Sequence, residues 1–186
     1  GAKIRGIYFE GPYFTEKYGN PSSIYSLGSE TKAAITHARE IMAKSIGTTS
    51  ENIYFTAGGS ESDNWALVAT AEAYASKGKH IITSKIEHHA ILRPCADIER
   101  MGHPVSYLPV DYTGTVNIET LEENINSDTR LVSIMTANNE IGSIQNISAL
   151  AAIAHSCGAI FHTDAVQAVG HINASARIHD LFSKGR

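Results

Sequence analysis

The chain has 186 residues, and 19 acidic against 15 basic side chains give a formal net charge of −4. A chain without excess positive charge is poorly suited to gripping a phosphate backbone, so nucleic acid is excluded as a principal partner. The apolar share of 42% is that of a globular protein, not of a disordered or collagen-like chain. The length predicts a single domain, residues 1–186, that buries its own core.

Cysteine content and hydropathy indicate a compartment. Cys95 and Cys157 are too few for a disulfide framework, and both are interpreted as structural thiols. No signal peptide is visible, and the most apolar stretch, 147–161, is shorter than the roughly 20 residues of a membrane helix. We therefore expect a cytoplasmic protein with no membrane contact.

Hydrophobic periodicity predicts helices that alternate with strands along the chain. The first helix covers 29–46 and ends at Gly47, and a strand at 53–57 follows. A Ser-x-x-Asp signature of Ser60 and Asp63 is predicted to cap the next helix. The further predicted helices are 60–77, 89–100, 118–125 and 147–156, and the further predicted strands are 80–84, 105–110, 130–137 and 159–163. This alternation is typical of an α/β fold, a mostly parallel sheet with helices on both faces.

Polar turns follow the predicted strands, at the edge where open α/β sheets bind ligands. These turns are 58–60, 87–89, 138–140 and 164–167. The glycine turn 58–60 leads into a helix N-terminus, which suits a phosphate or carboxylate, although a serine after glycines can also be only a cap.

Three histidines and one aspartate have alternative interpretations. His88 and His89 are adjacent and lack zinc-ligand spacing, so no metal site is predicted; one of them could stack on a flat cofactor or lie incidentally on the surface. His162 lies in an apolar strand and is interpreted as a satisfied core histidine. Asp164 ends that strand, where it either pairs with a protonated ring nitrogen or caps a short helix at 165–169.

Taken together and in order, these motifs resemble those of the cysteine desulfurases, members of the class V aminotransferase group of pyridoxal-phosphate enzymes. The matching segments are PYFTEKYGNPSSIYSLG at 12–28, FTAGGSESDN at 55–64, HIITSKIEHHAI at 80–91, SIMTANNEIGSIQ at 133–145 and FHTDAVQAVGHI at 161–172. The resemblance implies the large domain of a fold-type I enzyme, incomplete at both ends, that binds pyridoxal 5′-phosphate and forms a homodimer.

The resemblance implies cofactor-binding roles for residues in each polar turn. Gly59 and Ser60 correspond to the cradle of the cofactor phosphate, with serine where the family more often has threonine. His88 corresponds to the histidine that stacks on the pyridine ring and is a candidate catalytic residue.

Three further residues are matched to the ring itself. Asp164 corresponds to the aspartate that pairs with the pyridinium nitrogen, and it is the second candidate catalytic residue. Gln167 corresponds to the side chain that bonds the phenolic oxygen of the ring. Asn139 corresponds to an asparagine near the cofactor and the substrate carboxylate.

The sequence also departs from the family pattern. The family's DNAATT-type segment and the helix after it do not occur between Phe9 and Tyr13, and Lys184 lacks the Ser-x-His that precedes the family's Schiff-base lysine. The nucleophilic cysteine, the substrate-binding arginine and the small C-terminal domain are also missing, and neither Cys95 nor Cys157 replaces that cysteine. We therefore expect no turnover by the isolated chain.

The activity implied by the resemblance is a sulfurtransferase reaction. The full-length enzyme would remove sulfur from L-cysteine and leave alanine and a protein persulfide, which passes sulfur to an acceptor or iron–sulfur scaffold protein. Two alternatives stay open at this point. One is a catalytically inactive remnant that acts as a binding or dimerisation module, and the other is a different class V activity such as selenocysteine lyase.

Overall fold

The computed structural model describes residues 11–171 and divides the chain into two compact units, Gly1–Tyr54 and Phe55–Arg186. The first unit contains α2 (Ser26–Ile46) and the short 3-10 helix η1 (Ser50–Asn52). As predicted, α2 ends at Gly47, whose φ of 75° is left-handed and whose N–H donates to the Ala43 carbonyl.

The predicted strand at 53–57 is wrong. The backbone at Ile53 is extended, yet this segment joins no sheet within the described residues. A β-rich sequence becomes a strand only where a neighbouring strand accepts its hydrogen bonds. The segment instead leads from η1 toward α3.

The second unit contains, within the described residues, one sheet of four parallel strands in the order β2-β1-β3-β4. The strands are β1 (His80–Ser84), β2 (Val105–Leu108), β3 (Thr129–Ser133) and β4 (Ile160–His162). The helices are α3 (Gly59–Ala73), α4 (His89–Arg100), α5 (Ile118–Asn124) and α6 (Ile147–Ser156). The predicted α/β class is confirmed, although β2, β3 and β4 are shorter than predicted and α3 ends at Ala73 rather than 77.

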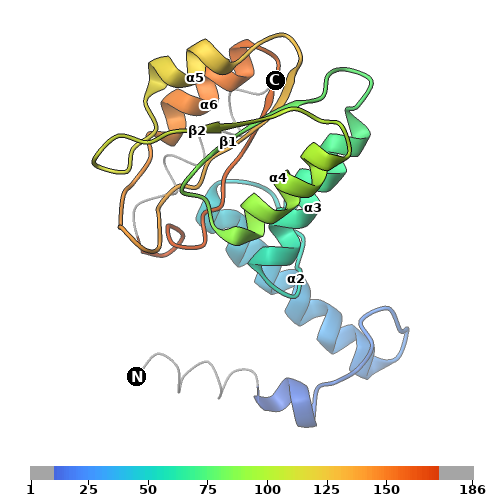
Figure 1. Cartoon of the computed structure of the whole chain (residues 1–186). Coiled ribbons are helices and arrows are strands. Elements are labelled where there is room, and N and C mark those ends of the chain that lie inside the picture. The colour runs from blue at the N-terminus through green and yellow to red at the C-terminus, as the bar shows by residue number, and fades with distance from the viewer. Residues whose placement is uncertain (1–10, 172–186) are drawn as a thin grey trace. The chain divides into compact units, whose positions relative to one another are not determined.

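Helices cover both faces of this sheet, as the alternation of buried side chains requires (Figure 1). Ile81 and Leu131 pack with α3 and α4 on one face, and Ile82 and Val132 pack with α5 and α6 on the other. The two clusters contain most of the large side chains that are fully buried in this unit. Each fully buried one stabilises the fold by roughly 1.5–3 kcal/mol.

The sheet has a switch point between β1 and β3, from which the chain continues toward opposite edges of the sheet. The chain leaves β1 for β2 at one edge of the sheet, whereas β3 is followed by β4 on the other side. Loops that leave neighbouring strands in opposite directions open a crevice at the carboxyl ends of those strands. This topology therefore places a binding site after β1 and β3.

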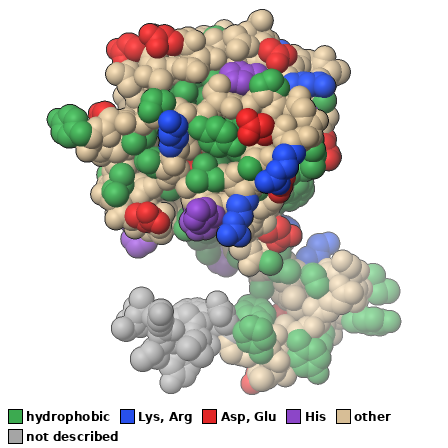
Figure 2. Space-filling view, in the orientation of Figure 1, with side chains coloured by type: hydrophobic (Ala, Val, Ile, Leu, Met, Phe, Trp, Pro, Cys, Tyr) green, Lys and Arg blue, Asp and Glu red, His purple; other side chains and the backbone are tan. Residues whose placement is uncertain are grey.

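Two further features of the described residues are the distribution of surface charge and the hydropathy of the helices. On the face shown in Figure 2, acidic and basic side chains are interspersed rather than gathered into one charged tract. No helix in the described range, 11–171, is long and apolar enough to cross a membrane.

Candidate functional site

A cavity of about 260 Å³ opens at the carboxyl ends of β1, β3 and β4. Its size is close to the lower end of the roughly 300–1,000 Å³ range of ligand pockets, which suits a small ligand. All six residues that were predicted to bind the cofactor line this cavity: Gly59, Ser60, His88, Asn139, Asp164 and Gln167. Four residues without a predicted site role complete the lining: Asp63, Ala90, Met135 and Val166.

The N-terminus of α3 forms one wall of the cavity. The first N–H groups of a helix have no intrahelical acceptor, and at α3 this end begins with Gly59 and Ser60. A Cβ atom on Gly59 would lie 3.3 Å from Cγ2 of Val166, so glycine keeps open the space between α3 and the turn after β4. Donor groups and open space together fit a bound phosphate.

The predicted cap of α3 by Ser60 and Asp63 is wrong. The N-cap residue is Gly58, two positions earlier than Ser60, which the signature requires. Glu61 accepts a hydrogen bond from the Ala57 N–H at 2.6 Å, so its carboxylate is occupied by the preceding loop. Asp63 therefore does not cap α3, and it lines the cavity instead.

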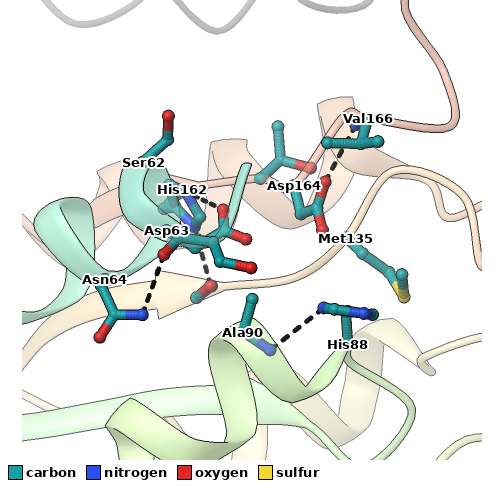
Figure 3. A network of polar contacts seen from close by, with 12 residues as sticks. Ser62, Asp63, Asn64, His88, Ala90, Met135, His162, Asp164 and Val166 are labelled. Atoms are coloured by element: carbon teal, nitrogen blue, oxygen red, sulfur yellow. Dashed lines mark hydrogen bonds and ion pairs between the residues drawn. The ribbon is translucent and has the colours of Figure 1, made fainter. Parts of the chain in front are cut away.

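His88 is the N-cap of α4, and its ring orientation is fixed by that role. Its Nδ1 accepts a hydrogen bond from the Ala90 N–H at 3.1 Å (Figure 3). Because Nδ1 is an acceptor, the neutral imidazole holds its proton on Nε2. The ring is held at the cavity wall by the backbone of α4, which suits a side chain that stacks on a flat ligand.

Asp164 lies in the turn after β4. Its Oδ1 accepts a hydrogen bond from the Val166 N–H at 2.9 Å, and its backbone carbonyl accepts one from the Thr136 N–H. The predicted helix at 165–169 is wrong, because the chain makes a single turn there before Gly170 with φ 81°. Asp164 therefore does form a local cap-like bond, and it also lines the cavity.

The pair Asn138 and Asn139 divides into a structural and a cavity-lining residue. Buried Asn138 accepts hydrogen bonds from the N–H groups of Glu140 and Ile141 and donates one to the Ile86 carbonyl. It thus joins the loop after β3 to the loop after β1. Asn139, the next residue, is directed to the cavity.

Replacing Asn138 with alanine is expected to reduce the free energy of unfolding by about 2 kcal/mol, because the partly buried Ile86 carbonyl and two partly buried backbone N–H groups lose their partner. Exposed Asn139 is the matched control, and its alanine variant should change stability by no more than about 0.5 kcal/mol. Urea unfolding compares the two. Equal losses would show that Asn138 does not hold the loops together.

Glu87 is a buried acid that sequence reasoning placed in a polar turn without giving it a role. Its carboxylate accepts hydrogen bonds from Ser84 Oγ at 2.5 Å and from the Met135 N–H at 3.0 Å. It joins the end of β1 to the end of β3, directly before His88. Burial raises the pKa of Glu87 to about 7.

His162 has a polar neighbour at each ring nitrogen, as expected of a satisfied histidine, but it is partly exposed and not a core residue. Its Nδ1 lies 2.9 Å from Ser133 Oγ, and its Nε2 lies 3.7 Å from Oδ1 of Asp63 (Figure 3). Burial lowers the pKa of His162 and raises the pKa of Asp63 to about 6. The sequence signal for Asp63 was misread as a helix cap.

Neither of the two cysteines is part of the cavity lining. Cys95 is a buried residue of α4, and burial raises the pKa of its thiol to about 12, which makes it unreactive. Cys157 is exposed at the end of α6 and so does not pack in the core. Lys184 lies outside the described residues.

Comparison with known proteins agrees with this geometry. The family model described as aminotransferase class-V matches residues 7–181. The cysteine desulfurase IscS of Dictyoglomus turgidum is 54% identical over 161 residues, which are 87% of this chain and 41% of that protein. The chain thus spans less than half the length of the curated relatives it matches.

Comparison with solved structures also finds similar proteins. A NifS-like protein superposes with a TM-score of 0.88 at 39% identity, covering 91% of this chain and 47% of its own. SspA in complex with cysteine superposes with a TM-score of 0.83 at 35% identity, covering 88% of this chain and 47% of its own. The likeness extends over nearly the whole of the present chain.

Proposed function

Because the chain belongs to the aminotransferase class-V family, we propose that it forms most of the cofactor domain of a cysteine desulfurase. The proposed protein binds pyridoxal 5′-phosphate and removes sulfur from L-cysteine to leave alanine and a protein persulfide. The observation that supports this proposal best is the single cavity lined by Gly59, Ser60, His88, Asn139, Asp164 and Gln167. The similarity to proteins named cysteine desulfurase supports the choice of reaction.

The α3 end of the cavity would hold the cofactor phosphate. The N–H groups at the start of α3 and the Ser60 hydroxyl are donors, and the positive end of the helix dipole favours an anion. Gly59 leaves the space that a larger side chain would fill against Val166. This end of the cavity thus anchors the cofactor without taking part in bond breaking.

The other polar residues of the cavity would control the cofactor ring. When bound, pyridoxal phosphate supplies an electron sink for bonds to the substrate Cα. Asp164 would keep the ring nitrogen protonated, His88 would cover the ring face, and Gln167 would donate to the phenolic oxygen. Asn139 would lie near the substrate carboxylate. These roles need one carboxylate, one flat side chain and amide donors at the strand ends, which the cavity provides.

We further propose that the complete protein is a cytoplasmic homodimer that passes its sulfur to an acceptor or iron–sulfur scaffold protein. Similarity to proteins named IscS supports the transfer of sulfur to an acceptor. The net charge of −4 argues against nucleic acid as the partner.

The complete protein that contains this chain should convert L-cysteine to alanine when supplied with pyridoxal 5′-phosphate. Alanine formation and protein persulfide are measured together, with the 186-residue chain assayed in parallel, and this chain is expected to give no alanine above the free cofactor. Turnover of L-selenocysteine without turnover of L-cysteine would contradict the desulfurase assignment. Cofactor binding without turnover of either would favour a binding module.

A further inference from the structure

Two carboxylates, and not one, border the ring side of the cavity. Asp63 enters from α3 and Asp164 from the turn after β4 (Figure 3). Asp63 is 5% exposed, so its charge is poorly screened by water. The resemblance gave a role to Asp164 alone.

The groups around Asp63 include no strong cation. His162 from β4 is the nearest, with Nε2 at 3.7 Å, but burial lowers its pKa and favours the neutral ring. His88, at the start of α4, stabilises the charged form of Asp63, whereas Asp164 opposes it. Glu87, in the turn after β1, is a further buried acid that repels a charge on Asp63. A negative charge on Asp63 therefore lacks a full counter-charge in the cavity itself.

A cationic ligand would supply that counter-charge. Burial and the neighbouring Asp164 raise the pKa of Asp63 to about 6, so its charge changes between pH 5 and pH 7. A protonated ring nitrogen beside Asp164 would favour the charged form of Asp63. By reciprocity, charged Asp63 favours the protonated ring to the same degree.

We propose that Asp63 is a second acid of the cofactor site, which acts through space beside Asp164 to strengthen the binding of a protonated pyridine nitrogen. The inference rests on the proposed function, because it assumes that the cavity binds pyridoxal phosphate. Asp63 is a positioning residue, and its effect is confined to the part of the ligand that bears positive charge. A ligand with the same phosphate and aldehyde but no ring nitrogen is insensitive to it.

The test compares pyridoxal 5′-phosphate with its 1-deaza analogue, in which carbon replaces the ring nitrogen. The ratio of their dissociation constants is measured for the complete protein and for its Asp63→Asn variant at pH 5 and pH 7.5. Phosphate binding, imine formation and the titration of the free ligand affect both proteins alike, so they cancel when the ratio for the parent is compared with the ratio for the variant. At pH 7.5 the preference of the parent for pyridoxal phosphate should exceed that of the Asp63→Asn variant about fivefold, because one poorly screened charge changes affinity by about this factor. At pH 5, where Asp63 is protonated, the two proteins should show equal preferences.

Glu61→Gln is the matched control, since Glu61 lies two residues away on α3 and bonds to the Ala57 N–H outside the cavity lining. Its preference should follow the parent's at both pH values. Equal preferences of Asp63→Asn and parent at pH 7.5 would overturn the inference while leaving the proposed function intact. A parent that binds neither ligand would overturn both.

Affinity for the deaza analogue also reports whether Asp63→Asn folds. If this variant binds neither ligand, the pH dependence of the parent's ligand preference is the test. After correction for the free ligand, its preference for pyridoxal phosphate must rise about fivefold between pH 5 and pH 7.5. A preference that stays constant over this range would overturn the inference.

Discussion

Replacing Asp164 with alanine in the complete protein is expected to weaken the binding of pyridoxal 5′-phosphate by about one to two orders of magnitude. A hydrogen bond to a charged group contributes roughly 1.5–3 kcal/mol, which corresponds to this loss of affinity. The rate of alanine formation should fall further, because the protonated ring nitrogen is needed most in the transition state. Titration of the cofactor absorbance gives the affinity.

Two variants separate the possible roles of Asp164. Asp164→Asn can still accept the hydrogen bond from the Val166 N–H but has no charge, so it should behave like the alanine variant if the carboxylate binds the ring. Asp111→Ala is the control, because Asp111 lies in the turn after β2 and bonds Thr113 outside the cavity. Equal affinity of the parent and all three variants would make the assignment of Asp164 wrong.

The stability of the fold should decrease as pH rises from about 4.5 to 7, and Glu87→Gln should remove much of this decrease. Burial raises the pKa of Glu87 from its ordinary 4.5 to about 7, so the folded state holds the proton roughly 3 kcal/mol more tightly than the unfolded state. Below pH 4.5 both states are protonated, so this contribution to stability is present in full and no longer changes with pH. Above pH 7 the folded state has lost that advantage in full.

Urea unfolding at pH 5 and pH 8 measures this effect. The glutamine variant keeps an oxygen for the Met135 N–H and should gain about 2–3 kcal/mol relative to the parent between the two pH values. Glu123→Gln, which removes an exposed acid on α5, is the control and should show the parent's pH dependence. A Glu87→Gln variant with that same dependence would refute a buried, proton-binding Glu87.

Much of the second unit could be predicted because local patterns and tertiary packing agree there. The bounds of β1, α4 and α6 were predicted to the residue, since buried strand, cap and helix periodicity coincide in these segments. The six site residues were named from the resemblance to the cysteine desulfurases, and they line one cavity because the strand ends of a parallel sheet meet at one edge. Their binding roles stay predictions.

Asp63 and Glu87 show what local patterns could not predict. Each is a polar residue close to a helix N-terminus, and an ordinary helix-capping residue has the same sequence pattern. Their burial depends on β3 and β4, which lie about 50 to 100 positions further along the chain. The strand expected at 53–57 failed for the opposite reason, because its local pattern has no partner in the described sheet.

The hydrogen bonds that frame the cavity impose an order on how the site is made during synthesis. Glu87 meets Met135 and Asn138 meets Ile86 across separations of 48 and 52 residues, and the turn after β4 lies later still. Contacts of such long range close slowly, after their local elements. On the ribosome the turn 58–60 and His88, for which we propose phosphate binding and ring stacking, emerge first. A nascent chain that ends before Asp164 would therefore present both without the acid that we propose to bind the ring nitrogen.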